Sequence, residues 1–247
     1  MRYLVLTDVH ANLEALDACL ADARTRAFDR VLVLGDLVGY GADPNAVVER
    51  VRALEPLAVV RGNHDKVARG VDQADGFNTA AKRAAQWMLN ELTTSNREWL
   101  AALPQGPCPV DALVEICHGS PFDEDAYIFD EQDARQALRA ATRPLCLFGH
   151  THCPTAFALS ADSVKKTTPG AGTDSHLQLR PGTTYLVNPG SVGQPRDGDP
   201  RAAYAMVDTG QRRVEWFRSA YAIEEAQAKV IRAGLPEALA NRLALGR

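Results

Sequence analysis

The sequence predicts an α/β protein built on a largely parallel β core. Short runs of Val, Leu and Ile recur along the first two thirds of the 247-residue chain, and helical patterns lie between them. Continuous apolar runs of this kind are typical of strands buried on both faces, and the intervening helices supply the crossovers that parallel pairing requires. No run approaches the roughly 20 apolar residues that cross a bilayer, so we expect no membrane partner.

Six apolar runs predict strands. In chain order they are YLVLTDVH (3–10), RVLVLGD (30–36), LAVVRGNHD (57–65), DALVEICHG (111–119), PLCLFGHTH (144–152) and TTYLVNPGS (183–191). Ligands of open α/β sheets gather at the carboxyl ends of the strands, and five of these runs end in metal-ligand residue types. They include five of the six histidines, namely His10, His64, His118, His150 and His152. One such histidine is usually structural, but five predict a shared site.

Helices are expected between the strands. Asn12 precedes leucines at helical spacing, and Asp43-Pro44 resembles an N-cap followed by Pro at the first helical position. Residues 78–92 are helical by composition, and Ser95-x-x-Glu98 has the spacing of a capping box.

The last third of the chain changes character. Residues 160–184 are rich in Ser, Thr, Gly and Asp, so we expect a loop or lid that carries His176. Residues 202–221 predict two strands joined as a hairpin around 208–211, and residues 222–246 predict a helix interrupted at 234–236. Because 46% hydrophobic composition can fill one large core, we expect a single domain over 1–247, with 221–247 as a helical extension of the 1–220 core.

Charge and cysteine usage restrict the partners and the compartment. The formal net charge is −4, from 27 basic and 31 acidic residues without long runs of one sign. We therefore expect no binding of long nucleic acids. Five cysteines without a CxxC motif favour a reducing, cytoplasmic location, and the first ten residues predict a strand rather than a signal peptide. Cys146 and Cys153 flank two histidines, which leaves a structural zinc site as a weaker alternative.

Five short motifs occur in a fixed order along residues 8–152. They are Asp8-x-His10, Gly35-Asp36, Gly62-Asn63-His64-Asp65, His118-Gly119 and Gly149-His150-Thr151-His152. In this order they resemble the calcineurin-like metallophosphoesterase superfamily, and most closely its small bacterial and archaeal branch related to diadenosine tetraphosphatase. The stretch NPGSVGQPRD (188–197) also resembles the loop that follows the last metal motif in that branch.

The resemblance implies a fold and a dinuclear metal site. The fold would have four αββα layers: two packed mixed β-sheets with helices on both outer faces. The implied ligands of the first metal are Asp8, His10, Asp36 and His152, and those of the second are Asp36 as a bridge, Asn63, His118 and His150. His64 would act just outside this ligand shell, oriented by Asp65.

This ligand set suits phosphoester hydrolysis. Two divalent ions can neutralise the phosphoryl charge and lower the pKa of a shared water, so the expected reaction is attack of a metal-bound hydroxide on a small phosphodiester or phosphomonoester, including nucleotides. Imidazole, carboxylate and amide ligands without thiolate are compatible with several ions. Mn²⁺ is our first expectation, and Fe, Zn²⁺, Co²⁺, Ni²⁺ and Mg²⁺ remain alternatives.

One departure from the family pattern bears on which substrates we expect. The stretch GDLVGYGADP (35–44) lacks the arginine that protein phosphatases and symmetrical dinucleoside polyphosphate hydrolases usually carry there. Arg196 and Arg61 are the candidate replacements as phosphate contacts. An inactive scaffold subunit is an alternative function, but every matched position is filled; a nuclease of short oligonucleotides is another. Nothing in the sequence indicates the oligomeric state.

Overall fold

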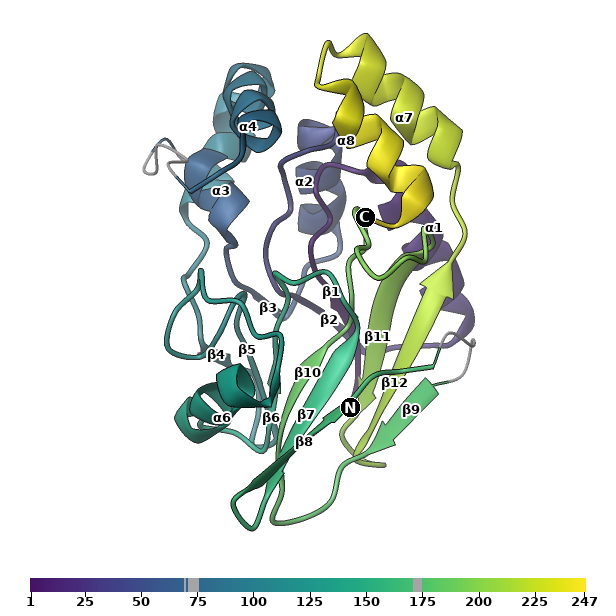
Figure 1. The fold of residues 1–247 in the computed structure, drawn as a ribbon. Coiled ribbons are helices and arrows are strands. Elements are labelled where there is room, and N and C mark those ends of the chain that lie inside the picture. Colours follow the sequence, from purple (N-terminus) through teal and green to yellow (C-terminus); the bar gives the residue numbers. More distant parts are fainter. Residues whose placement is uncertain (69, 71–75, 171–174) are drawn as a thin grey trace.

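The structure is a computed structural model that describes residues 1–68, 70, 76–170 and 175–247. Two six-stranded sheets pack face to face (Figure 1). The first sheet has the order β3 (Ala58–Val59), β2 (Arg30–Val33), β1 (Arg2–Leu6), β11 (Ala202–Asp208), β12 (Arg213–Ser219) and β9 (Ser175–Gln178). The second has the order β4 (Cys108–Pro109), β5 (Val114–Ile116), β6 (Leu145–Leu147), β10 (Thr184–Asn188), β7 (Thr155–Ser160) and β8 (Ser163–Thr167).

Apolar side chains form separate layers between these elements. Within β1, Tyr3 and Val5 pack between the two sheets, whereas Leu4 and Leu6 face the opposite way, toward the helices, because successive side chains of a strand alternate. The helices of the first outer layer are α1 (Leu13–Thr25), α2 (Pro44–Ala53), α3 (Asn63–Ala68), α4 (Thr79–Glu91) and α5 (Thr94–Ala101). Helix α6 (Glu131–Ala140) covers the second sheet. The four-layer αββα fold is thereby confirmed.

The expectation of a largely parallel core is correct only for part of each sheet. Strands β1, β2 and β3 pair in parallel, as do β5, β6 and β10. The remaining pairs are antiparallel, among them the predicted hairpin β11–β12 and the unpredicted hairpin β7–β8. Short connections allow only antiparallel pairing, and residues 161–162 alone separate β7 from β8.

The loop or lid expected at residues 160–184 is therefore wrong for residues 163–167 and 175–178, which are strands, whereas 168–170 and 179–183 connect strands as irregular segments. Strand β8 extends the second sheet, and β9, with His176 opposite Glu215, extends the first. Alternating polar side chains are compatible with edge strands that face solvent on one side, and a composition rich in Ser and Thr does not distinguish such strands from loops. Residues 171–174 of the expected loop lie outside the described residues.

Helix caps also separate correct from incorrect expectations. Asn12 accepts a hydrogen bond from the main-chain N–H of Ala15, as predicted, and Asn78, which the sequence placed at the start of a helix, accepts one from Ala81. The capping box at Ser95 is wrong, because Thr93 caps α5 and Ser95 lies inside it. Asp43 stands at the N-cap of α2 but makes no capping hydrogen bond; its carboxylate instead binds Lys229 at 2.8 Å.

The C-terminal segment returns to the rest of the chain. It consists of α7 (Ile223–Arg232), α8 (Glu237–Asn241) and a short 3-10 helix, η1 (Arg242–Leu245), so the break expected at 234–236 is present. Val230, Leu235 and Leu239 share an apolar cluster with Tyr40 and with Ala84 of α4. In the part of the chain that the structure describes, no helix is both long and apolar enough to span a membrane.

Candidate active site

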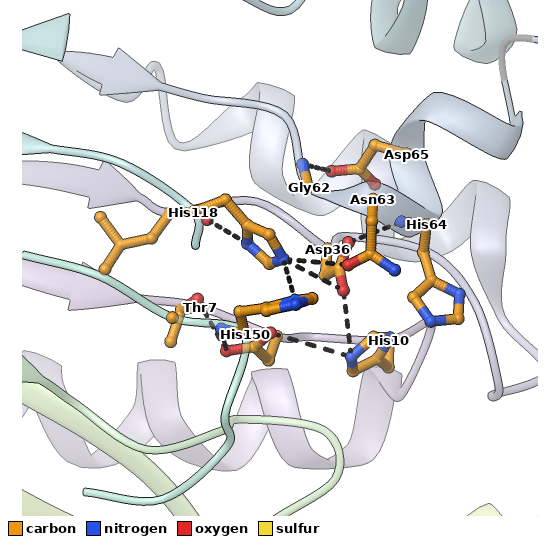
Figure 2. A network of polar contacts seen from close by, with 12 residues as sticks. Thr7, His10, Asp36, Gly62, Asn63, His64, Asp65, His118 and His150 are labelled. Carbon is orange, nitrogen blue, oxygen red and sulfur yellow. Dashed lines mark hydrogen bonds and ion pairs between the residues drawn. The ribbon is translucent and has the colours of Figure 1, made fainter. Parts of the chain in front are cut away.

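The expected metal ligands meet at one edge of the two packed sheets. Asp8 and His10 follow β1, Asp36 follows β2, Asn63 begins α3, His118 follows β5, and His150 and His152 follow β6. Their ligand atoms form two groups, each within 4.8 Å, composed of Asp8, His10, Asp36 and His152, and of Asp36, His118 and His150. All six residues are buried, and Asp36 belongs to both groups. Figure 2 shows the His10 and His118 rings directed toward Asp36.

Main-chain carbonyls orient the four imidazole rings. Each ring has one nitrogen facing a carbonyl oxygen: His10 Nδ1 faces Val38 at 3.1 Å, His118 Nδ1 faces Leu34 at 2.8 Å, His150 Nε2 faces Asp125 at 3.1 Å and His152 Nδ1 faces Gln194 at 2.6 Å. A carbonyl oxygen only accepts, so that nitrogen must carry the proton. The other nitrogen of each neutral ring therefore presents a lone pair to the cluster, as in metal-binding histidines.

These lone pairs face one another at short range. His10 Nε2 lies 3.1 Å from His152 Nε2, and His150 Nδ1 lies 3.2 Å from His118 Nε2. Two acceptors this close repel unless a metal ion or a proton lies between them. Ligands about 2.0–2.1 Å from one zinc-sized ion are separated by about 3.0–3.4 Å. His118 Nε2 is also 3.2 Å from Asn63 Oδ1 and 3.4 Å from Asp36 Oδ2. The donor set thus fits two neighbouring divalent ions.

The ionisation of the cluster also favours a bound cation. Burial raises the pKa of Asp8 to about 7, because a buried carboxylate is costly without a compensating charge. Burial opposes a charge on His118 as well, but the Asp36 and Asp8 carboxylates outweigh it and raise the pKa of His118 to about 10. Burial lowers the pKa of His150 to about 3. A positive charge is therefore stabilised next to Asp36 and disfavoured on the ring of His150.

Tight turns after the strands position these ligands. Asp8, His10, Asp36, His150 and His152 all have a left-handed backbone, with φ between 49° and 66°. Non-glycine residues adopt this region at a cost, and such residues concentrate at functional sites. Gly62 allows one of these turns to close, because a Cβ there would overlap the Asp36 carboxylate.

His64 is buried beside the expected ligands but its ring has different neighbours. It packs 4.4 Å from Tyr40, 4.4 Å from Phe77 and 5.0 Å from His10, measured between ring centroids. Gly39 leaves room for the ring, since a Cβ at that position would overlap Nδ1. Nδ1 has no hydrogen-bond partner in the described chain, and burial lowers the pKa of His64 to about 4.

The role expected for Asp65 is not supported. Its Oδ1 accepts hydrogen bonds from the main-chain N–H groups of Leu37 and Val38, and its Oδ2 accepts one from Gly62. Figure 2 shows the carboxylate turned toward Gly62 and away from the His64 ring. Asp65 therefore holds together the two turns that carry Asp36 and Asn63. Adjacency in sequence could not distinguish this role, because consecutive residues of a helix point in different directions.

The loop at 188–197 supports the site through hydrogen bonds to the turns that carry the expected ligands. Asn188 Nδ2 donates to the carbonyl oxygen of Gly149 at 2.7 Å and to Thr151 Oγ1 at 3.0 Å. Ser191 Oγ donates to the carbonyl oxygen of Asp8 at 2.8 Å. The loop thus fixes the turns that place Asp8, His150 and His152.

We expect Asn188→Ala to lower the free energy of unfolding by about 1–3 kcal/mol, because it leaves buried polar groups without their donor. Metal affinity should fall with it, since the turn between His150 and His152 loses its support. Urea unfolding and metal titration measure the two effects. Asn90→Ala, at an exposed position of α4, is the matched control, and equal stability of the two variants would contradict the assignment.

The two arginines expected at the substrate have different surroundings. Arg61 donates twice to Glu124, at 2.9 Å each, so we no longer propose it as a phosphate contact. Arg196 Nη2 donates to Tyr40 and to Gln194 Oε1, while its buried Nε has no partner in the described chain. Positive charge on Arg196 is among the causes that lower the pKa of His10, His64 and His152. Arg196 therefore lies at the cluster.

The structural zinc site considered for Cys146 and Cys153 has no basis in the described residues. Neither metal-binding group includes a cysteine. Cys146 is buried in β6 with its Sγ 3.5 Å from that of Cys117, and Cys153 Sγ donates to the carbonyl oxygen of Arg196. All five cysteines are free.

Several residues of the site were not identified from the sequence. Tyr40 separates His10 and His64 from the C-terminal helices, and the Tyr127 ring lies 3.8 Å from that of His150 and stacks on Phe129. Tyr40 stands in the glycine-rich run VGYG directly after the Asp36 motif, which is a usable signal for a site residue. Tyr127 lies in a loop with no recognisable pattern.

Comparisons with known proteins agree with this geometry. Residues 1–212 match the model of the calcineurin-like phosphoesterase superfamily domain. An uncharacterized protein of Methanocaldococcus jannaschii is 35% identical over 98% of this chain and 97% of its own. The crystal structure of a metallophosphoesterase from Sphaerobacter thermophilus is 40% identical, with a TM-score of 0.88 over 100% and 99% of the two chains. A hypothetical protein from Pyrococcus horikoshii, 20% identical, shares the fold with a TM-score of 0.79 over 100% and 98%.

Proposed function

Because this chain belongs to the calcineurin-like phosphoesterase superfamily, and is thus a hydrolase acting on ester bonds, we propose that it hydrolyses small phosphodiesters or phosphomonoesters at a dinuclear metal centre. The observation that carries the proposal is the convergence of four buried imidazole rings on Asp36, with His10 Nε2 3.1 Å from His152 Nε2 and His118 Nε2 3.2 Å from His150 Nδ1. A scaffold subunit has no need of so many metal-ligand atoms gathered in one buried cluster.

The residues divide into two sets around Asp36. Asp8, His10 and His152 would hold one ion, Asn63, His118 and His150 the other, and Asp36 would bridge them, since its Oδ2 lies 3.6 Å from His10 Nε2 and 3.4 Å from His118 Nε2. Two divalent ions supply charge neutralisation and an activated water. Imidazole, carboxylate and amide ligands suit Mn²⁺, which we propose as the activating ion.

The residues around the centre would bind and orient the substrate. Arg196 presents an unpaired Nε next to the histidines, where a guanidinium can bind phosphoryl oxygens through charge-assisted hydrogen bonds. His64 is placed to give a proton to the leaving oxygen. Asp65 does not stabilise the protonated form of His64. The negative charge of a bound phosphoester would stabilise it instead.

Two further features support proposals on the domain organisation and the location of the enzyme. We propose that residues 1–247 form one domain, because α7 and α8 share an apolar cluster with Tyr40 and α4. Five free cysteines support a reducing location such as the cytoplasm.

A substrate panel tests the proposed function. Purified enzyme is assayed with a monoester, a diester, cyclic nucleotides and dinucleoside polyphosphates under several divalent ions, and its metal content is measured in parallel. We expect two ions per chain and metal-dependent turnover of a nitrophenyl ester. A chain that binds no metal and turns over no member of the panel would support the scaffold alternative instead.

Replacing Arg196 by Gln should raise KM about 10- to 100-fold with unchanged metal content, because a hydrogen bond to a charged group contributes about 1.5–3 kcal/mol. Steady-state kinetics with a nitrophenyl ester and elemental analysis measure the two quantities. Arg24→Gln, at an exposed position of α1, is the control. A KM equal to that of this control would remove Arg196 from the substrate site.

A further inference from the structure

The C-terminal segment brings a second arginine to the wall of the active site. The guanidinium carbon of Arg242, in η1, lies 5.8 Å from the centroid of the Tyr40 ring, and that of Arg196 lies 5.8 Å from the same centroid. The Tyr40 ring is itself 4.6 Å from His10 and 4.4 Å from His64. Two cationic side chains therefore share one aromatic ring directly beside the expected metal ligands.

Within the described residues, this arginine pair lacks acidic side-chain partners. Arg218, Arg201 and Arg61 each bind a side-chain carboxylate. Arg196 and Arg242 form no ion pair with a described Asp or Glu side chain, and Arg242 donates from Nε to a main-chain oxygen of Arg247, the last residue of the sequence. Both side chains are half-buried. Burial, and then the charge of Arg196, lower the pKa of Arg242, so each guanidinium is placed where an anion would stabilise it.

Unpaired nitrogens surround the same tyrosine. Arg196 Nε, Gln194 Nε2 and His64 Nδ1 are buried and have no hydrogen-bond partner in the described chain. Buried polar atoms are nearly always satisfied, and those on Arg196 and Gln194 can only donate. An acceptor-rich anion next to Tyr40 would satisfy them together with the free guanidinium nitrogens of Arg242.

The position of Arg242 is fixed by the rest of the chain. The N–H of Gly198, two residues after Arg196, donates to the carbonyl oxygen of Gly246 at 3.0 Å, and the chain end lies beside this loop (Figure 1). Gly246 has φ +61°, and a Cβ there would press on the backbone of Asp199. Lys229 of α7 binds both Glu14 and Asp43. These contacts hold the segment at both ends, at Lys229 of α7 and at Gly246.

We propose that Arg242 and Arg196 together bind a second phosphate group of the substrate, next to the phosphoryl group that is hydrolysed. The preferred substrates would then carry two neighbouring phosphates, as organic diphosphates and nucleoside polyphosphates do. This inference rests on the proposed function for the position of the reacting phosphoryl group. Two guanidinium forks can bind several oxygens of one phosphate in fixed directions, which a lysine cannot reproduce.

Binding of orthophosphate and pyrophosphate to Arg242→Gln tests the proposal. Both ligands are titrated by calorimetry into the metal-loaded enzyme at one buffered free-metal concentration. We expect the dissociation constant for pyrophosphate to rise at least about tenfold more than that for orthophosphate, a difference of about 1.4 kcal/mol. The exposed Arg232→Gln on α7 is the control and should bind both ligands as the unmodified enzyme does.

A second variant keeps the result interpretable. Arg242→Lys preserves the charge, and we expect it to lose most of the preference for pyrophosphate because the planar fork is gone. If Arg242→Gln does not fold, as judged by thermal unfolding, the lysine variant decides. Equal weakening of both ligands, or no change, overturns the inference. Loss of the pyrophosphate preference in a protein that hydrolyses no phosphoester would uphold the binding of two neighbouring phosphates at Arg242 and Arg196 and reject the proposed function.

Discussion

Asp36→Asn should abolish hydrolysis and release bound metal, because Asp36 alone belongs to both ligand groups. The substitution preserves the shape of the side chain and an acceptor for the main-chain N–H of His64, which donates to Asp36 Oδ1 at 2.9 Å. It removes the negative charge. Losing one member of a buried charge pair costs about 3–5 kcal/mol, equivalent to about 10²- to 5 × 10³-fold. Since two ions depend on this carboxylate, we expect kcat/KM to fall by at least that factor.

Elemental analysis of the variant measures the metal directly. Asp162→Asn removes an exposed carboxylate in the turn between β7 and β8, with 92% of its side chain accessible, and should retain both metal and activity. Thermal unfolding separates metal loss from misfolding. Two ions per chain in Asp36→Asn would show that the carboxylate does not bridge them.

His64→Ala should keep both ions and lose kcat mainly for esters with poor, alkoxide-like leaving groups. A positioned proton donor contributes about 10²- to 10⁴-fold when the leaving oxygen needs a proton, whereas esters of acidic phenols depart without one. The ring contributes no atom to either ligand group, and its Nδ1 is free of hydrogen-bond partners in the described chain, so the metals do not depend on it.

The comparison uses an alkyl phosphoester and a nitrophenyl phosphoester under identical metal concentrations. His176→Ala, at an exposed position of β9, is a matched control that should change neither rate. An equal loss of kcat on both esters, or a loss of metal, would show that His64 supports the site without donating a proton.

Local chemistry explains the parts of the site that were predictable. Apolar runs identify buried strands, and the turn after each strand must place the next residues at the sheet edge, so the positions of Asp8, Asp36, His118 and His150 follow from motif and topology. The cap at Asn12 was equally predictable, because an N-cap hydrogen bond joins residues three apart. These features depend only on neighbours along the chain.

Other assignments depended on residues far away in sequence. From the sequence alone, Arg61 could contact a phosphate, but in the structure it binds Glu124. Asp43 could likewise cap α2, but its carboxylate binds Lys229, 186 residues away. Asp65 could orient His64 according to the sequence alone, but the turn at 36–38 brings two main-chain N–H groups to its carboxylate and Gly62 supplies a third. A charged side chain has several local options, and burial selects the one that leaves the fewest polar groups unsatisfied.

By itself, the sequence determined the family and the edge of the sheets at which the buried Asp and His residues meet, because short motifs and strand periodicity carry that information locally. Only the tertiary structure decided that β8 and β9 are strands, that Asp65 supports turns, and that Arg242 reaches Tyr40. The pairing of β9 with β12 and the docking of α7 and α8 come from long-range contacts, whose free energy exceeds weak local preferences and leaves no periodic signal in the chain.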